Sequence, residues 1–295
     1  MQNQQASRTA EYMAFFRALE TMEPPARRLF ADPYAFALLV GPLRTFARMA
    51  RFPLMGSLVR AVLEFGWPYT RSSGVVRTRA IDDLVNDAIF AGARQLVLLG
   101  AGFDSRAWRL QETQKIAVFE VDHPVTQRAK RERLNASIDQ LSAQIRFVPV
   151  DFEKDDLRAT LADAGFDPLI PSVVVWEGVI SYLTKPAVER TFTLLAGLLA
   201  PTSRLIFTYM DKGAIDGSKE FPGARRWRSW VKFSGEPFIF GFDPDTLGET
   251  LRSFGFLLMS DESTEETAQR YCKLLGRTEH GSRAYRVTTA VRAEA

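Results

Sequence analysis

Short apolar runs alternate with helix-like patterns through the middle of the chain. Five runs are typical of buried strands, at residues 95–99, 116–121, 145–149, 172–176 and 204–208. Between them, apolar residues recur at the spacing of one helix face, in the segments 105–110, 124–135, 157–164 and 185–199. This alternation predicts an open α/β fold with a parallel sheet and right-handed crossovers.

Two more strands are expected near the C-terminus, at residues 256–260 and 284–291, where they would form an antiparallel pair. The segment that joins them contains few apolar residues. The total is then seven strands. A count of seven favours the Rossmann-like sheet of class I methyltransferases over the six-stranded sheet of dinucleotide-binding domains.

Helical patterns precede the sheet. Residues 77–91 have the spacing of an amphipathic helix, and residues 32–66 that of short helices broken by proline and glycine. We therefore expect an N-terminal helical cap over residues 1–76 and a core domain over residues 77–295.

The alternation stops after the fifth strand, over about residues 211–243. This stretch mixes aromatic residues with glycine and proline, and it follows the carboxyl end of a strand, where ligands bind in open α/β sheets. We expect a lid over a substrate pocket, with Trp227, Trp230 and Phe238 as acceptor-binding residues. The alternative is a segment that only covers the core.

Composition narrows the class of protein and its partners. The chain has 295 residues, 46% of them hydrophobic, with 38 basic and 35 acidic side chains that are interspersed, so we expect no nucleic-acid partner. No window approaches the ~18 apolar residues of a membrane span, and no signal-peptide pattern is recognisable. A single cysteine suits a reducing compartment. We expect a cytoplasmic protein without a membrane partner and, with two histidines, without a metal site.

A glycine-containing turn follows the first strand and consists of Gly100, Ala101 and Gly102. Glycine lets the backbone approach a ligand closely. The third glycine expected for a pyrophosphate cofactor is Ser105 here, and Asp104 beside it would repel a pyrophosphate but suit an ammonium group. The loop therefore favours S-adenosylmethionine (SAM) over a nicotinamide dinucleotide. Asp104 is equally typical of a helix cap.

Acidic residues mark the ends of the next three strands. Asp122 is placed to bind the two hydroxyls of a ribose. Asp151 and Phe152 are placed to bind adenine, unless they are a helix cap and a core aromatic residue. Glu177 would bind an ammonium group or face the substrate.

Arg77 and Arg79 are both able to hold the carboxylate of SAM, and the residue pattern does not choose between them. The chain resembles the leucine carboxyl methyltransferase family over about residues 77–210, in the order of these segments: RTRAIDDLV, LLGAGFDSRAWRL, FEVDHP, VPVDF and WEGVISYL. The resemblance implies a role for each site residue: Arg77 for the SAM carboxylate, the Gly100–Gly102 loop for the methionine part, Asp122 for the ribose, Asp151 and Phe152 for adenine, and Glu177 for the amino group.

The family includes bacterial enzymes that methylate polyketides and other small metabolites, so the resemblance implies a SAM-dependent O-methyltransferase of secondary metabolism. The acceptor would be a carboxylate or a hydroxyl of a small molecule. Proximity and alignment supply most of the acceleration of such a displacement. A carboxylate acceptor needs no general base, whereas a hydroxyl acceptor does, and only Tyr182 and Tyr209 are candidates. Three alternatives remain: methylation of a protein C-terminus, a nicotinamide-dependent oxidoreductase and a non-catalytic sensor.

Overall fold

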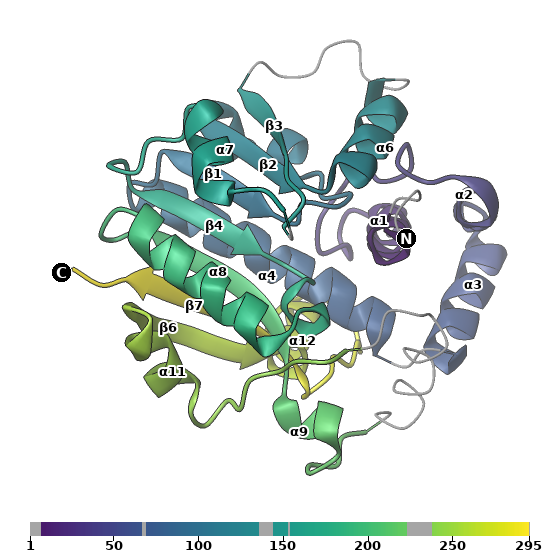
Figure 1. The fold of residues 1–295 in the computed structure, drawn as a ribbon. Coiled ribbons are helices and arrows are strands. Elements are labelled where there is room, and N and C mark those ends of the chain that lie inside the picture. The colour runs from purple at the N-terminus through teal and green to yellow at the C-terminus, as the bar shows by residue number, and fades with distance from the viewer. Residues whose placement is uncertain (1–6, 67–68, 136–143, 153, 223–237, 295) are drawn as a thin grey trace.

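The computed structural model describes residues 7–66, 69–135, 144–152, 154–222 and 238–294. Its centre is a seven-stranded sheet with the order β3-β2-β1-β4-β5-β7-β6 (Figure 1). The strands are β1 (Gln95–Leu99), β2 (Ala117–Asp122), β3 (Ile145–Pro149), β4 (Ser172–Trp176), β5 (Arg204–Met210), β6 (Phe256–Ser263) and β7 (Tyr285–Arg292). The first five pair in parallel, and β7 lies antiparallel between β5 and β6, so the predicted fold class and the C-terminal antiparallel pair are confirmed.

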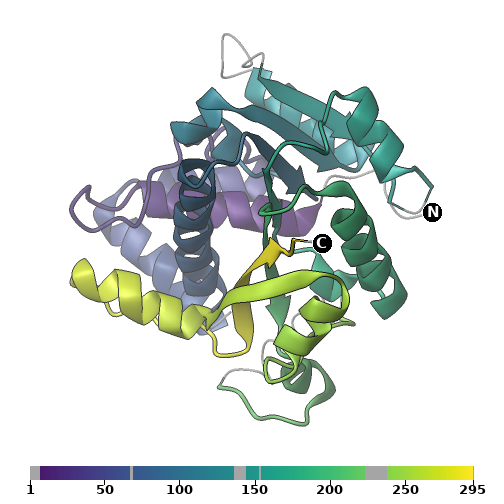
Figure 2. The same cartoon turned by 90° about the vertical axis from the view of Figure 1, so that its left-hand side faces the viewer.

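Helices cover both faces of this sheet (Figures 1 and 2). The α-helices are α1 (Arg8–Thr21), α2 (Gly41–Met49), α3 (Pro53–Gly66), α4 (Thr70–Phe90), α5 (Arg106–Arg109), α6 (Pro124–Asn135), α7 (Leu157–Asp163), α8 (Lys185–Leu198), α9 (Lys212–Asp216), α11 (Leu247–Ser253) and α12 (Thr264–Leu274). Two short 3-10 helices are η1 (Glu112–Lys115) and η2 (Ile180–Tyr182). Among the described residues, no helix is both long and apolar enough to span a bilayer.

The central strands are buried on both faces, which explains their continuous apolar sequences. In β1, Leu96 and Leu98 pack with residues of α1, α4 and α12, whereas Val97 and Leu99 pack with residues of α7, α8 and α11. The sheet is therefore the middle of three layers. This arrangement directs the carboxyl ends of the parallel strands to one edge, where the connecting loops meet.

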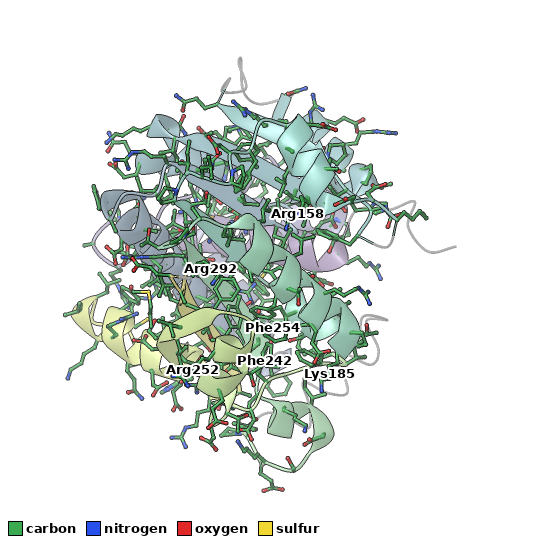
Figure 3. The ribbon with its side chains drawn as sticks, turned by 60° about the vertical axis from the view of Figure 1, so that its left-hand side comes forward. Arg158, Lys185, Phe242, Arg252, Phe254 and Arg292 are labelled. Carbon is green, nitrogen blue, oxygen red and sulfur yellow. The ribbon has the colours of Figure 1, made fainter. Side chains whose placement is uncertain are left out.

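Aromatic packing fixes the layer formed by α8 and α11. The ring of Phe192 in α8 lies 5.5 Å from that of Phe207 in β5 and stacks on Phe254 at 5.4 Å. Phe242 also contacts Phe192, at 6.0 Å, and Figure 3 labels Phe242 and Phe254 on this face. Such pairs add roughly 0.5–1.5 kcal/mol each beyond area burial.

Two elements differ from the sequence-based expectation. Helix α4 begins at Thr70 and runs without a break past residue 77, so the expected boundary between cap and core lies inside one helix. The segment between the last two strands is helix α12, which a capping box starts: Ser263 Oγ accepts from the Glu266 N–H, and the Glu266 carboxylate accepts from the Ser263 N–H. Its inner face consists of small and polar residues, so the pattern of large apolar residues is missing.

Candidate functional site

A cavity of about 510 Å³ opens at the carboxyl ends of β1, β2 and β4, within the usual size range of small-molecule sites. Most of its wall comes from four parts of the chain that are distant in sequence: the loop after β1, the turn after β4, helix α4 and helix α1. Asp122, Phe152 and Ile239 complete it. The shape of the cavity therefore depends in part on how α1 and α4 pack against the sheet.

The loop after β1 follows the cavity wall with left-handed backbone at two glycines. Gly100 has φ +72° and Gly102 has φ +48°, and both line the cavity together with Ala101. A Cβ added to Gly100 would lie 2.5 Å from Val179 Cγ2, so this position accepts no side chain. The Ala101 N–H donates to the Val121 carbonyl, 3.0 Å away, which ties the loop to β2.

Asp122 lies at the end of β2 on the cavity wall, and backbone groups orient its carboxylate. Oδ2 accepts from the Gly102 N–H at 2.5 Å, and Oδ1 accepts from the His123 N–H at 2.7 Å. Burial raises the pKa of Asp122, and the N–H groups of His123 and Gly102 oppose this only in part. Each oxygen keeps acceptor capacity for a hydroxyl group of a ligand.

Glu177 follows β4 and is held between two buried arginines. Its Oε1 lies 2.8 Å from Arg77 Nε, and its Oε2 lies 3.0 Å from Arg106 Nη1. Burial alone would raise the pKa of Glu177, but the charges of Arg77 and Arg106 outweigh it and hold the pKa below its ordinary value. The group is therefore a carboxylate at neutral pH.

Arg106 is the site residue that our sequence analysis missed. Its side chain is 1% exposed and also contacts Asp104 and, at 3.1 Å, Asp82. Asp104 Oδ1 also accepts from the Arg106 N–H and lines the cavity, but the N-cap of α5 is Ser105. The role of Asp104 toward an ammonium group stays a prediction. The signal was present, because Arg106 is the arginine of the Asp-Ser-Arg sequence after the glycine loop.

The structure separates the two arginines that the sequence could not. Arg77 lines the cavity, with its guanidinium 4.9 Å from the ring centroid of Tyr285. Arg79 points elsewhere, pairing with Asp83 at 3.0 Å and donating to the Leu29 carbonyl. Two residues along a helix turn a side chain by about 200°, which explains the difference.

Helix α1 forms one wall of the cavity, although its sequence contained no motif that we could assign. Met13 and Arg17 line this wall. Arg17 Nε lies 2.8 Å from Asp32 Oδ2, which also accepts from Ser105 Oγ at 2.5 Å. This buried network fastens the N-terminal helix to the loop after β1.

The predicted adenine-binding pair is only partly at the cavity. Phe152 lines it and is 44% exposed. The side chain of Asp151 pairs with Lys154, at 2.7 Å, and is not part of the cavity wall. The role of Asp151 toward adenine stays a prediction.

The two tyrosine candidates have different positions. Tyr182 lines the cavity, and its ring contacts that of Phe238 edge to face, with centroids 4.8 Å apart. The prediction for Tyr209 is wrong: this side chain is buried on the opposite face of β5, and its OH donates to Asp261 Oδ2 at 2.9 Å. Neighbouring strand residues point to opposite faces, and here Thr208, not Tyr209, faces the site.

The expected lid is described only at its two ends. Trp227 and Trp230 lie outside the described residues. After the gap, the Ile239 N–H donates to the Ser181 carbonyl at 2.7 Å, which places Ile239 on the cavity wall next to Tyr182. In the described part of the chain, no group of three side chains is arranged to bind a metal ion.

The sequence is similar to those of known proteins over most of its length. Residues 10–196 match the family model described as leucine carboxyl methyltransferase. A Mycolicibacterium smegmatis protein, provisionally named an S-adenosyl-L-methionine-dependent methyltransferase, is 36% identical over 225 residues, covering 75% of this chain and 68% of that protein. Another protein of that organism with a similar name is 33% identical over 268 residues, covering 88% and 86%.

Solved structures show the same fold at low sequence identity. The crystal structure of a provisionally assigned methyltransferase from Thermobifida fusca aligns with a TM-score of 0.59 and 17% identity, covering 94% of this chain and 97% of that chain. At this identity the likeness concerns the arrangement of the sheet and its helices.

Proposed function

The chain belongs to the leucine carboxyl methyltransferase family, and from this premise we propose that it is an O-methyltransferase that esterifies a carboxylate of a small-molecule acceptor with the methyl group of SAM. The coarser activity, SAM-dependent methyl transfer, follows from the family and from relatives over most of the chain. One observation supports the finer proposal: the carboxylates of the cavity wall are all engaged by arginines or backbone N–H groups.

The donor groups of the cavity fit SAM. Its amino-acid part needs both signs of charge, and Arg77 would hold the carboxylate while Glu177 and Asp104 would face the amino group. Asp122 would accept hydrogen bonds from the ribose hydroxyls. The left-handed glycines of the loop leave room for the methionine chain. When bound, SAM supplies a methyl group activated by a positively charged sulfur.

Engagement of the wall carboxylates favours an acceptor that is already ionised. Asp104 and Glu177 are paired with arginines, and Asp122 would bind the ribose hydroxyls, so none of the three is left to remove a proton from an acceptor. A carboxylic acid is ionised at neutral pH, and its oxygen forms the new C–O bond as the C–S bond breaks, with no proton transfer. The chain then has only to position the two reactants and exclude water. A hydroxyl acceptor would need a base, and Tyr182 is the candidate on the wall.

Apolar groups on the cavity wall support a small acceptor over a protein C-terminus. Tyr182, Ile239 and Met13 line it, and Phe238 supports the tyrosine ring. Such a wall suits an aliphatic or aromatic acid whose carboxylate points to the methyl group. An acceptor of secondary metabolism, of polyketide type, fits this description.

Two measurements test the proposal. SAM or S-adenosylhomocysteine at about 100 times its dissociation constant should stabilise the protein by about 2.7 kcal/mol, and NAD should not. Methyl transfer from labelled SAM to a panel of aromatic and aliphatic acids should give base-labile methyl esters. Stabilisation by NAD alone would overturn the assignment, and base-stable ethers from phenols would move the acceptor to a hydroxyl.

A further inference from the structure

Two helices of the N-terminal region carry apolar side chains that are exposed to solvent. Helices α2 and α3 follow one another along an edge of the molecule, on the far side of α1 from the sheet (Figure 1). Of the sixteen large apolar side chains found exposed among the described residues, eight lie between Val40 and Phe65. Exposed apolar residues are normally scattered singly, and a concentration of this kind marks a contact surface.

Helix α3 is apolar on its inner and its outer side. Leu63 is buried against the core, and Val59 packs against the same cluster. On the outer side, Leu54, Leu58 and Val62 are 87%, 53% and 62% exposed. Their spacing of four residues places them in one stripe, about 12 Å long. A row of large apolar side chains on the outer side of a helix is normally covered, so the outer stripe of α3 indicates a contact surface.

Helix α2 and the turn after it extend this surface. Phe46, Met49 and Phe52 are 48%, 38% and 68% exposed. Arg44 and Arg48 lie one turn apart on another exposed part of α2. An amphipathic helix with aromatic and aliphatic groups beside arginines is typical of helices that lie in a lipid interface.

The exposed charged side chains between positions 33 and 66 are all basic. Arg44, Arg48 and Arg51 are exposed, and the only acidic residue between positions 33 and 66 is Glu64, which accepts from the Tyr69 N–H at 3.1 Å. Arg60 is paired with Glu23 at 3.0 Å. The apolar side chains are thus bordered by cations, which complement a negatively charged partner.

We propose that this face docks on an anionic lipid surface, with the helices lying on the membrane and not crossing it. The docking face consists of Phe46, Met49, Phe52, Leu54, Leu58 and Val62, bordered by Arg44, Arg48 and Arg51. A second copy of the chain fits less well, because an isologous contact would bring these arginines together. A protein groove accepts one helical stripe, whereas a lipid surface accepts the side chains of both helices at once. The inference replaces the expectation of no membrane partner and is independent of methyl transfer.

Vesicle co-sedimentation of the full chain tests this proposal. The protein should sediment with vesicles of phosphatidylcholine and phosphatidylglycerol, less with phosphatidylcholine alone, and less at high salt. The double variant Leu58→Gln/Val62→Gln should bind about tenfold or more weakly, since two apolar contacts are lost. The double variant Arg44→Gln/Arg48→Gln should bind anionic vesicles more weakly, by on the order of fivefold per arginine, and should bind neutral vesicles as the parent does. The matched control is Leu169→Gln. The Leu169 side chain is 85% exposed and lies outside the docking face, so this variant should bind as the parent does.

Several outcomes would overturn the docking face. Absence of sedimentation with anionic vesicles is one, and an equal loss in the Leu169→Gln control is another. A dimer that dissociates in Leu58→Gln/Val62→Gln, without vesicle binding by the parent, would assign the face to a second copy. A lower melting temperature of that variant than of the control would mean that the stripe packs within its own chain and is not a docking face.

Discussion

Arg106 Nη1 lies 3.0 Å from Glu177 Oε2, and the same nitrogen donates to Asp104, so one buried guanidinium holds two carboxylates of the cavity wall. Burial would raise the pKa of both acids, but Arg106, with Arg77 beside Glu177, holds both values below the ordinary range. We infer that Arg106 is a positioning residue. Through these contacts it would keep two negative charges in place for the amino group of SAM.

Replacing Arg106 should make SAM binding sensitive to pH. In the parent protein, Glu177 and Asp104 should add no pH dependence to the affinity between about pH 7 and pH 5, because their pKa values are lowered and both stay ionised. A dependence from Asp122, whose pKa is raised, is common to the parent and the variants. In Arg106→Gln, burial dominates, the pKa values rise, and affinity should fall as the pH drops through this range. Calorimetric titrations at several pH values measure this effect.

The variant Arg106→Lys separates positioning from folding. It keeps the charge, so it should recover the pH profile of the parent protein but not the full affinity, since lysine offers no fork of donors. Loss of one partner of a buried ion pair also costs about 3–5 kcal/mol of stability, so thermal unfolding must be followed in parallel. A folded Arg106→Gln protein with the same pH profile as the parent would contradict the assigned role.

The variant pair Arg77→Ala and Arg79→Ala tests which arginine faces the cofactor. Arg77→Ala should weaken SAM binding by roughly 1.5–3 kcal/mol, the range for hydrogen bonds to charged groups. Arg79→Ala should leave binding unchanged, because its side chain contacts Asp83 and the Leu29 carbonyl away from the cavity. Equal losses in isothermal calorimetry would contradict the assignment.

Asp122 should contribute to cofactor binding more than to folding. Asp122→Ala removes an acceptor for two ribose hydroxyls and should cost roughly 1.5–3 kcal/mol of SAM affinity. Asp122→Asn keeps the shape and one acceptor oxygen and should lose less. Both variants should fold, because the side chain lies at the end of a strand and not in the core. Unchanged affinity for both variants would exclude Asp122 from the binding site.

Because of Glu120, the free energy of unfolding should fall as the pH rises from weakly acidic to neutral. Its carboxylate is buried beside Lys130, at 2.8 Å, and burial raises its pKa from 4.5 to about 7 despite this lysine. The folded state then holds more protons than the unfolded state between these two values, so the stabilisation present below pH ~4.5 is lost as the pH rises toward 7. The negative charges of Asp104 and Asp122 also raise the pKa of Glu120.

The double variant Glu120→Gln/Lys130→Met removes this pair without leaving an unpaired buried charge. Melting temperatures of the variant and the parent should be compared from pH 4.5 to 8. Their difference should change in favour of the variant up to about pH 7 and stay constant above it. A constant difference over the whole range would show that Glu120 does not titrate there.

The strands of the sheet and the ends of β1, β2 and β4 could be predicted from sequence because buried parallel strands leave continuous apolar runs, and a polar residue marks where each run stops. Helix α12 could not, because small and polar residues such as Thr267 and Cys272 pack its inner face and give no strong period. Tyr209 was misplaced because one residue of register along a strand decides which face a side chain takes.

The remaining part of the site depends on contacts between distant segments. Helix α1 reaches the cavity through Arg17 and its buried partner Asp32, and neither residue belongs to a local motif. The pairing of Glu177 with Arg106 joins positions 71 residues apart. Such contacts follow from packing of the whole chain and cannot be derived from spacing within one segment.

Phe238 should affect the acceptor and not the cofactor. Its ring contacts Tyr182 on the cavity wall at 4.8 Å, and the backbone beside it is fixed by the bond from the Ile239 N–H to the Ser181 carbonyl. Phe238→Ala removes the support of the tyrosine ring, so the KM for the acceptor should rise about tenfold while the dissociation constant of SAM stays the same. Steady-state kinetics with an acid that the parent enzyme methylates give the KM, and calorimetry with SAM gives the dissociation constant.

The alternative is that the segment around Phe238 only covers the core, and Phe254→Ala is the matched control for it. Phe254 stacks on Phe192 at 5.4 Å in the layer of α8 and α11, away from the cavity, so its loss should lower the melting temperature and leave the KM unchanged. If Phe238→Ala behaves in the same way, with lower stability and an unchanged KM, the acceptor does not reach this wall. A raised KM in Phe238→Ala alone supports the expected lid, because the two variants remove the same ring from different surroundings.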